Sequence, residues 1–484
     1  MAPAFPHAAA ARVAIDTALG GHKKEVGEAG PDLNSFSAAD FNVGGHPGAL
    51  SGRHGGSDSD GHRPHSSIPE SPPMRKNFLF RVLTAACSLV CATGFAQQAD
   101  NPLLAAAQRH MPAFVQDLGT LVNIDSGTDD ARGLAQVEAF LAQRLHDLGA
   151  KVDILAAPPA AGKMVRGTLQ GSGSKDLMLM IHYDTVFGVG EAAKRPFKVE
   201  GGKAFGPGVA DAKGGAMIIL HALALAREQG IDSYRTLTVL FNPDEEKSSL
   251  GSRALIRELS MKQDAVLIYE PPEADLVTVA TNGIAYVHLE VKGLASHAGS
   301  APEKGRNAAI ELSNQILQLK DLGSAEKGTT VNWTVVHAGD KVNIIPEKAE
   351  ATADMRMSDV SEIERVQRDA DEIVGRKKLI PGTEVKVKVE NRRPPFTKNP
   401  ASDQLAATAN SIYKEIGKAI EPASMRYGTD AGFAYIPGSG NKPVVLDGMG
   451  IVGNRIHSSE EWADLDSIPP RLYLTVRMLQ TLGK

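Results

Sequence analysis

Three continuous apolar runs of strand length limit the fold of this chain more than any other feature. They occupy residues 177–181, 237–241 and 265–269, and the segments between them are long enough for a helix. A strand without polar alternation must be covered on both faces, which is typical of a parallel sheet between layers of helices. Residues 215–227 read as one such helix. The order strand, helix, strand, helix, strand predicts an α/β domain with a mostly parallel sheet.

The pattern changes after residue 283. Strands are expected at 284–291, 331–336, 349–357 and 385–389, and helices at 307–322 and 362–374. This order is β-α-β-β-α-β, the ferredoxin-like arrangement, and the strict alternation at 385–389 suits a sheet with one open face. Helices and short strands resume after residue 396. Because 484 residues exceed one ordinary core, we expect a large domain formed by 97–282 and 396–484, with 283–395 inserted into it.

The first 96 residues do not resemble part of either domain. Residues 1–73 are rich in Gly, Ser, Pro, Ala and His and lack apolar periodicity, so we interpret them as a disordered or non-native leader. Residues 74–96 have a basic start, an apolar stretch and small residues before a cleavage point, which is typical of a signal peptide rather than a membrane span. A periplasmic or secreted protein is therefore expected. Both cysteines lie in this segment, so any metal would be held by His and carboxylates.

Composition argues against a nucleic-acid partner. The formal net charge is -5, and aromatic residues make up only 5% of the chain. Nucleic-acid binding favours a basic face and aromatic rings on which bases stack. We therefore expect no nucleic-acid partner.

Imidazole and carboxylate groups gather where the predicted buried strands end. His182 and Asp184 follow the first run, Glu245 and Glu246 follow the second, and Glu270 follows the third. Parallel strands present their carboxyl ends at one edge of a sheet, where ligands bind. A charged residue after one strand could simply be exposed to solvent. Charged residues after three strands of one sheet predict a common crevice.

Asp211 lies in a glycine-rich loop before the predicted helix. The loop, residues 206–215, could bind phosphate at a helix N-terminus, yet it has neither nucleotide-binding spacing. The glycines are better explained as letting the backbone turn so that Asp211 points into the crevice.

Taken together, these motifs resemble the zinc aminoacylase/carboxypeptidase superfamily, and within it the bacterial glutamate carboxypeptidases of the carboxypeptidase G type. The resemblance runs from about residue 101 to the C-terminus. The segments that carry it are 182–186, 206–215, 244–246, 296–299, 343–346, 428–431 and 456–458.

The resemblance implies two zinc ions in each subunit. One zinc would be bound by His182 and Glu270 and the other by Glu246 and His457, with Asp211 bridging both. Mixed imidazole and carboxylate sets that leave room for water are what catalytic zinc requires.

The resemblance also implies roles for other residues. Asp184 would orient the His182 imidazole, and Glu245 would be the general base. His297, in the inserted domain, would reach the active site of the partner subunit of a homodimer and stabilise the oxyanion. The carboxylate of the substrate would be bound by Asn343, Arg356 and Arg393.

The function implied is a metallo-exopeptidase that releases a C-terminal amino acid, glutamate, from N-acyl or small peptide substrates. Two alternatives stay open: a dipeptidase or N-acyl-amino-acid deacylase of the same superfamily, and a non-catalytic metal-binding protein. The chain departs from the family pattern at Pro243, at 247–250 and at Arg426 and Tyr427, which bears on the preference for glutamate.

Overall fold

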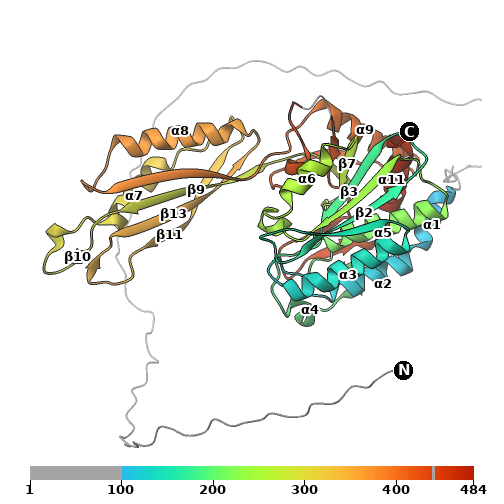
Figure 1. Ribbon diagram of the computed structural model, residues 1–484, viewed down its shortest axis with the longest axis horizontal. Helices are drawn as coiled ribbons and strands as arrows, with labels where there is room; N and C mark the ends of the chain where they lie inside the picture. The colour runs from blue at the N-terminus through green and yellow to red at the C-terminus, as the bar shows by residue number, and fades with distance from the viewer. Residues whose placement is uncertain (1–100, 439–441) are drawn as a thin grey trace, which may run out of the picture. The chain divides into compact units, whose positions relative to one another are not determined.

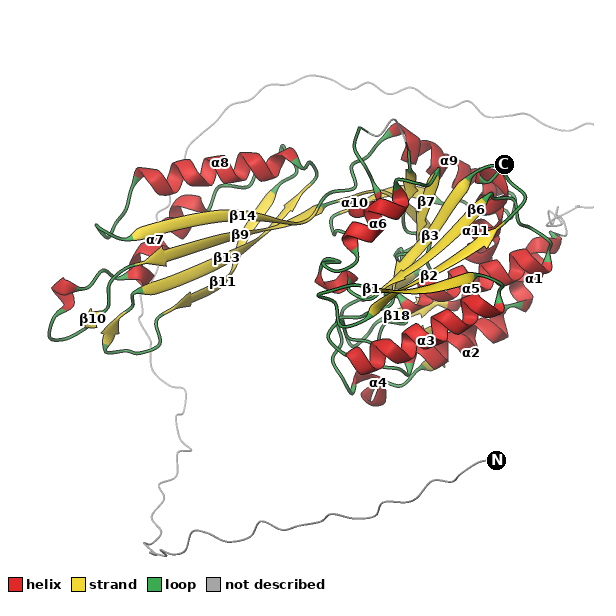
Figure 2. Ribbon diagram, in the orientation of Figure 1, coloured by secondary structure: helices red, strands yellow, loops and turns green. Residues whose placement is uncertain are grey.

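The computed structural model describes residues 101–438 and 442–484 (Figure 1). The predicted leader and signal peptide lie outside the described residues. Within the described ranges, no helix is both long and apolar enough to cross a membrane. Figure 2 shows how helices and strands alternate along the chain.

Three helices come first in the described part of the chain. They are α1 (Pro102–Arg109), α2 (Met111–Val122) and α3 (Ala131–Asp147). The Asn101 side chain accepts a hydrogen bond from the Leu104 N–H, and the Asp130 side chain accepts from the N–H groups of Arg132 and Gly133. These side chains satisfy N–H groups that a helix cannot bond internally, so they fix where α1 and α3 begin.

The large sheet has six strands in the order β1-β2-β6-β3-β7-β16. They are β1 (Lys151–Ala156), β2 (Lys163–Gln170), β3 (Asp176–His182), β6 (Thr236–Asn242), β7 (Ala265–Ile268) and β16 (Val444–Leu446). Strands β6, β3, β7 and β16 are parallel, whereas β1 and β2 pair antiparallel at one edge. The mostly parallel sheet is thus confirmed. The antiparallel β1–β2 pair was not predicted from the sequence.

Helices cover both faces of this sheet, as the apolar runs predicted (Figure 2). Leu177, Leu179 and Ile181 of β3 enter one core with α3, α5 (Lys213–Glu228), α9 (Pro400–Lys414) and α11 (Ile468–Leu482). Met178 and Met180 point to the other face and pack with α6 (Arg253–Ser260) and α10 (Ala431–Ala434). Because successive side chains of a strand alternate between faces, an unbroken apolar run is required here.

A smaller four-stranded sheet, β17-β18-β5-β4, lies beside the glycine-rich loop. Its members are β4 (Lys198–Glu200), β5 (Lys203–Phe205), β17 (Gly453–Asn454) and β18 (Trp462–Asp464). Strand β5 therefore leads directly into residues 206–212, and β17 and β18 flank the turn that contains His457. Short helix α4 (Glu191–Lys194) precedes β4.

Residues 283–393 form a separate sheet with its own core, which we call the small domain. Its strands β9 (Gly283–Lys292), β11 (Thr330–Ala338), β13 (Lys348–Met357) and β14 (Glu384–Arg393) lie in the order β11-β13-β9-β14, all antiparallel. Helices α7 (Ala308–Leu319) and α8 (Ser361–Arg376) pack on one face only. This order and topology are those predicted, β-α-β-β-α-β.

The chain leaves and re-enters the large domain at neighbouring points. Strand β8 (Leu276–Thr281) pairs in parallel with β15 (Glu421–Met425). The Thr281 N–H donates to the Phe396 carbonyl at 2.9 Å, and the Asn282 N–H donates to Tyr427 at 3.0 Å. An insertion between adjacent points leaves the surrounding pairing intact.

Candidate active site

The carboxyl edge of the large sheet presents the charged residues that the sequence singled out. His182 is the last residue of β3, and Asp184 follows two positions later. Glu245 and Glu246 begin the short 3-10 helix η1 (Glu245–Lys247) after β6, and Glu270 follows β7. Because β3, β6 and β7 are parallel neighbours, all three ends open on the same side.

Asp211 lies between two imidazole rings. Its Oδ1 is 3.1 Å from His182 Nε2, and its Oδ2 is 3.1 Å from His457 Nε2. Gly208 adopts a left-handed φ of +74°, and a Cβ there would lie 2.6 Å from the Thr185 side chain, so only glycine fits this turn. The loop thus delivers Asp211 to the crevice as the glycine pattern predicted.

Two further carboxylates complete the cluster. Glu270 Oε2 is 3.7 Å from His182 Nε2, and Glu246 Oε2 is 3.2 Å from His457 Nε2. Asp211 therefore joins two groups, one around each imidazole. His182, Asp211 and Glu246 offer ligand atoms within 4.8 Å of one another, close enough to hold a metal ion.

The Glu246 carboxylate is only partly satisfied by protein groups. Burial and the neighbouring Asp211 carboxylate raise the pKa of Glu246 to about 8, and its buried Oε1 has no hydrogen-bond partner. Hydrogen bonds to Asp211 and Glu246 raise the pKa of His457 to about 11. Buried carboxylates that lack a partner are costly unless a cation lies among them. The donor set of two imidazoles and three carboxylates fits one or two divalent ions such as zinc.

Asp184 is fully buried and holds two parts of the site together. Its carboxylate lies 3.2 Å from His182 Nδ1, and it accepts hydrogen bonds from the Glu245 N–H at 3.0 Å and the Thr128 hydroxyl at 2.7 Å. The His182 ring is thereby oriented with Nε2 toward Asp211, and the start of η1 is fixed against the same carboxylate.

Glu245 pairs with Arg393. The Arg393 guanidinium is ion-paired with the Glu245 carboxylate and donates to the Glu245 carbonyl at 2.6 Å and the Gly428 carbonyl at 3.1 Å. Arg393 is only 2% exposed. Glu245 and Glu246 thus point to different partners, although they are adjacent in sequence.

Asp430 is a buried residue of the site region to which the sequence analysis assigned no role. It lies 3.8 Å from the Arg393 guanidinium and accepts a hydrogen bond from Asn242 at 2.7 Å and another from the Ser249 hydroxyl. Ser248 and Ser249 both have positive φ, a strained conformation for serine that this network holds in place. The segment 428–431 was recognised as a motif, but only the fold shows that Asp430 supports the loop after Glu246.

The remaining predicted residues belong to the small domain and have no contact with the cluster within this chain. His297 is exposed, and its Nδ1 accepts the N–H groups of Gly299 and Ser300, both at 3.1 Å. The Arg356 guanidinium is paired with Asp354 at 2.8 Å. Asn343 is exposed and its carbonyl accepts from the Ala298 N–H.

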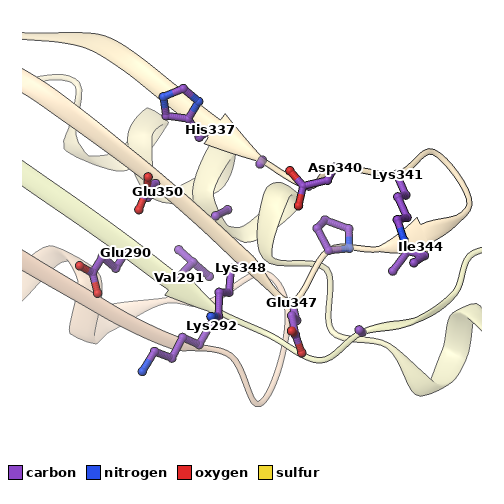
Figure 3. Close-up of a pocket in the computed structure, with 15 residues that line it drawn as sticks. Glu290, Val291, Lys292, His337, Asp340, Lys341, Ile344, Glu347, Lys348 and Glu350 are labelled. Carbon is purple, nitrogen blue, oxygen red and sulfur yellow. The ribbon is translucent and has the colours of Figure 1, made fainter. Parts of the chain in front are cut away.

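Figure 3 shows a groove of about 690 Å³ on the small sheet. It is lined mainly by charged residues of both signs, including Glu290, Lys292, Lys348 and Glu350, with His337 at its rim. None of its lining residues is one of the predicted site residues. We interpret this groove as a solvated sheet face.

Comparison with known proteins agrees with this geometry. The family model described as Peptidase family M20/M25/M40 matches residues 178–481. The chain belongs to this peptidase family. Carboxypeptidase G2 from Pseudomonas sp. (strain RS-16) is 41% identical over 417 residues, which cover 85% of this chain and 99% of that protein. Acetylornithine deacetylase from Proteus mirabilis (strain HI4320) is 30% identical over 51% of this chain and 67% of that protein.

Solved structures of M20-type peptidases share the fold. Aminopeptidase PepT from Bacillus cereus superposes with a TM-score of 0.63 at 22% identity, over 77% of this chain and 99% of that one. An M20 family metallo-carboxypeptidase from Sulfolobus solfataricus gives 0.60 at 16% identity, over 76% and 99%. The chain is accordingly a metal-dependent peptidase of family M20, as the motif resemblance predicted.

Proposed function

We propose that this M20 peptidase is a two-zinc carboxypeptidase that hydrolyses the amide bond to a C-terminal glutamate in N-acyl or small peptide, folate-like substrates. The observation that carries the proposal is Asp211, whose two oxygens face the imidazoles of His182 and His457 at equal distance. The 41% identity to carboxypeptidase G2 over nearly all of that protein supports the reaction class.

Five residues would hold the two zinc ions. His182 and Glu270 would bind one, His457 and Glu246 the other, and Asp211 would bridge them. Zinc in such a site polarises the scissile carbonyl and lowers the pKa of a bound water. The unpartnered Oε1 of Glu246 supports the assignment, because a buried carboxylate oxygen without a donor is otherwise unfavourable.

Glu245 would take the proton from the attacking water and pass it to the leaving nitrogen. Its backbone N–H is anchored on Asp184, so the base is positioned by the same carboxylate that orients His182. General acid–base catalysis needs the base within hydrogen-bond reach of the proton that it moves. Glu245 is 8% exposed, so its carboxylate is largely shielded from competing bulk water.

The substrate carboxylate would be bound by Asn343, Arg356 and Arg393. An arginine fork can donate to both carboxylate oxygens at once. Because Arg393 is already paired with Glu245, we propose that it exchanges this partner for the substrate, which frees Glu245 when the substrate arrives. Arg356 would similarly leave Asp354.

His297 would act in the active site of the other subunit of a homodimer. Its Nδ1 accepts two backbone N–H groups, so the neutral ring carries its proton on Nε2. This tautomer presents an N–H donor, which is what stabilising an oxyanion requires. The small domain, proposed as residues 283–395, would form the contact between subunits through its uncovered sheet or strand edge.

The proposal is tested by hydrolysis of a panel of substrates that share one acyl group and differ in the C-terminal amino acid, with zinc added. We expect glutamate to be cleaved fastest and its amide poorly, since a neutral amide cannot replace the carboxylates with which Arg356 and Arg393 are paired. The similarity to acetylornithine deacetylase favours an N-acyl-amino-acid deacylase as the second candidate. Preference for short N-acetyl groups would support that reading, cleavage confined to free dipeptides would indicate a dipeptidase, and no turnover would indicate a metal-binding protein.

We also propose that the enzyme matures by removal of residues 1–96 and acts in the periplasm or outside the cell. The motivation is the signal-like segment 74–96. Intact-mass measurement of the exported protein should give a chain that begins near Gln97. A mass that includes residues 1–73 would contradict this.

A further inference from the structure

Glu461 is a buried carboxylate that touches the loop carrying Asp211. It accepts hydrogen bonds from three backbone N–H groups of that loop, those of Gly208 at 2.9 Å, Ala210 at 2.9 Å and Asp211 at 3.0 Å. The residue is 1% exposed. One carboxylate thus fixes three peptide planes directly before the proposed bridging ligand.

The strand pairing explains why Glu461 reaches this loop. In the antiparallel pair β18–β5, Trp462 lies opposite Phe205 and Ala463 opposite Ala204. The residue before Trp462 is therefore opposite the start of the glycine-rich loop. The same hairpin contains His457 in the turn between β17 and β18. Glu461 consequently links the segment that carries His457 to the loop that carries Asp211.

A second contact holds the other side of the loop. The buried Lys213 ammonium donates to the Pro207 carbonyl at 3.3 Å and to the Ile124 carbonyl at 2.8 Å. The Glu461 carboxylate thus accepts from the N–H groups of the loop, and the Lys213 ammonium donates to one of its carbonyls. Burial of a carboxylate is unfavourable unless hydrogen bonds compensate it, and here three N–H donors do so.

We infer that Glu461 is a positioning residue that sets the Asp211 carboxylate between His182 and His457, and thereby sets the affinity of the site for metal. The inference rests on the proposed two-zinc site. Glu461 itself is not one of the proposed zinc ligands, and it acts on them only through the backbone of residues 208–211. A residue that merely stabilised the fold would leave the metal affinity of the folded protein unchanged.

The experiment is a zinc titration of metal-free protein, followed by calorimetry, on the wild type and three variants. Glu461→Gln keeps the size but replaces one acceptor oxygen by an NH₂ group that faces N–H donors. We expect at least one zinc to bind about 10- to 100-fold more weakly, the range found when groups that support metal ligands are removed. Glu461→Asp keeps the negative charge but shortens the side chain by one CH₂ group, so it should also bind zinc more weakly than the wild type.

Glu460→Gln is the matched control, because Glu460 is the neighbouring residue but is exposed and paired with Arg455. It should bind zinc like the wild type. If Glu461→Gln does not fold, Glu461→Asp decides the question with the same expected direction. Wild-type zinc affinity in a folded Glu461 variant with a lowered melting temperature would overturn the inference. A wild-type protein that binds no zinc would instead overturn the proposed function and this inference with it.

Discussion

The large and small domains hold their predicted functional residues in different ways. In the large domain His182 and Asp184 are at most 2% exposed and follow a strand whose two faces are both buried. In the small domain His297 is exposed, and Arg356 lies on the sheet face that α7 and α8 leave uncovered. His182 and Asp184 are thus fixed by the core of the large domain, and Arg393 is the one predicted small-domain residue that is buried against that site, through Glu245.

The imidazoles and carboxylates of the candidate metal site lie together within a single chain. The two imidazoles and the carboxylates meet at distances of 3.1 to 3.7 Å. No described contact joins His297 or Asn343 to that cluster. A packed core fixes the positions of the side chains that lie next to it. Side chains on an open sheet face are fixed only when a partner or a substrate binds them.

The largest effect is expected from Glu245→Gln. The variant keeps the shape of the side chain but cannot accept the proton, so turnover should fall roughly 10²- to 10⁴-fold. Zinc binding should remain normal, because Glu245 pairs with Arg393 and is not one of the proposed zinc ligands. Metal analysis after dialysis, beside the kinetic assay, measures both quantities.

Glu246→Gln is the matched variant for that experiment. A neutral amide is a poorer zinc ligand than a carboxylate, so one ion should be lost or weakly held. If Glu245→Gln lost zinc while Glu246→Gln retained both ions, the two roles would have to be exchanged. Full activity in both variants would contradict the two-zinc mechanism.

His297→Ala should reduce turnover by about 10²- to 10³-fold, the usual cost of removing one oxyanion donor. Mixing this variant with Glu245→Gln tests whether the histidine acts across subunits. A hybrid dimer would then contain one site with an intact Glu245 and the intact His297 of the partner subunit. Activity should reappear after the two inactive proteins are unfolded, mixed and refolded together.

The control is each variant refolded alone, which should stay inactive. Failure of the mixture to regain activity, with hybrid dimers demonstrated by mass, would place His297 in its own subunit. The contrast between the two domains would then no longer hold for this residue.

Arg356→Met should raise KM about 10- to 100-fold with a smaller effect on kcat. The estimate follows from losing a charge-assisted hydrogen bond worth about 1.5 to 3 kcal/mol. Arg393→Met should raise KM as well and also lower kcat, because Arg393 contacts Glu245. Arg392→Met is the control, since Arg392 pairs with Glu390 instead. Steady-state kinetics with acid and amide substrates measure these effects. If Arg356→Met had the same KM as the wild type for both substrates, Arg356 would not bind the substrate carboxylate.

The smallest effect concerns stability in the large domain. Burial lowers the pKa of His221 to about 4, and nearby His110 and Arg144 act in the same direction, against the Asp117 carboxylate 3.3 Å away. The unfolded chain, with an ordinary histidine pKa of about 6.5, binds the proton more readily. His221 should therefore contribute to the fall in the free energy of unfolding as pH decreases from about 6.5 to 4, by at most about 1.4 kcal/mol per pH unit.

Denaturant titrations of the wild type and His221→Gln between pH 4 and 7 measure this contribution. The variant should have the shallower pH dependence. His146→Gln is the control, since the His146 side chain is 76% exposed. Equal slopes for the wild type and His221→Gln would disprove the buried neutral state of His221.

The sequence predicted the parts of the fold that repeat a simple pattern. The apolar runs of β3, β6 and β7 and the alternation in β14 were sufficient to identify both sheets. The antiparallel pair β1–β2 was missed, because Lys151–Ala156 and Lys163–Gln170 mix polar and apolar residues and neither contains an unbroken buried run.

The site residues that could be predicted are those whose residue type stands out at the end of a strand or within a motif. Glu461 and Asp430 could not be assigned in this way, since their roles depend on which distant N–H groups or side chains face them. A clue to Glu461 was available in its position four residues after His457. Its partners at 208–211 are about 250 residues away in sequence, and only the β18–β5 register brings them together.

The insertion also orders events during synthesis. Strand β16 completes the large sheet beside β7, and His457 follows β16 in the chain. A ribosome therefore synthesises all four strands of the small sheet, which pair with one another, before it reaches β16. The small domain is expected to fold first. Until β16 is made, one edge of β7 stays unpaired, because this partner strand lies about 180 residues later in the chain. During that interval the growing chain is most exposed to aggregation through that edge, and chaperone binding should be concentrated there.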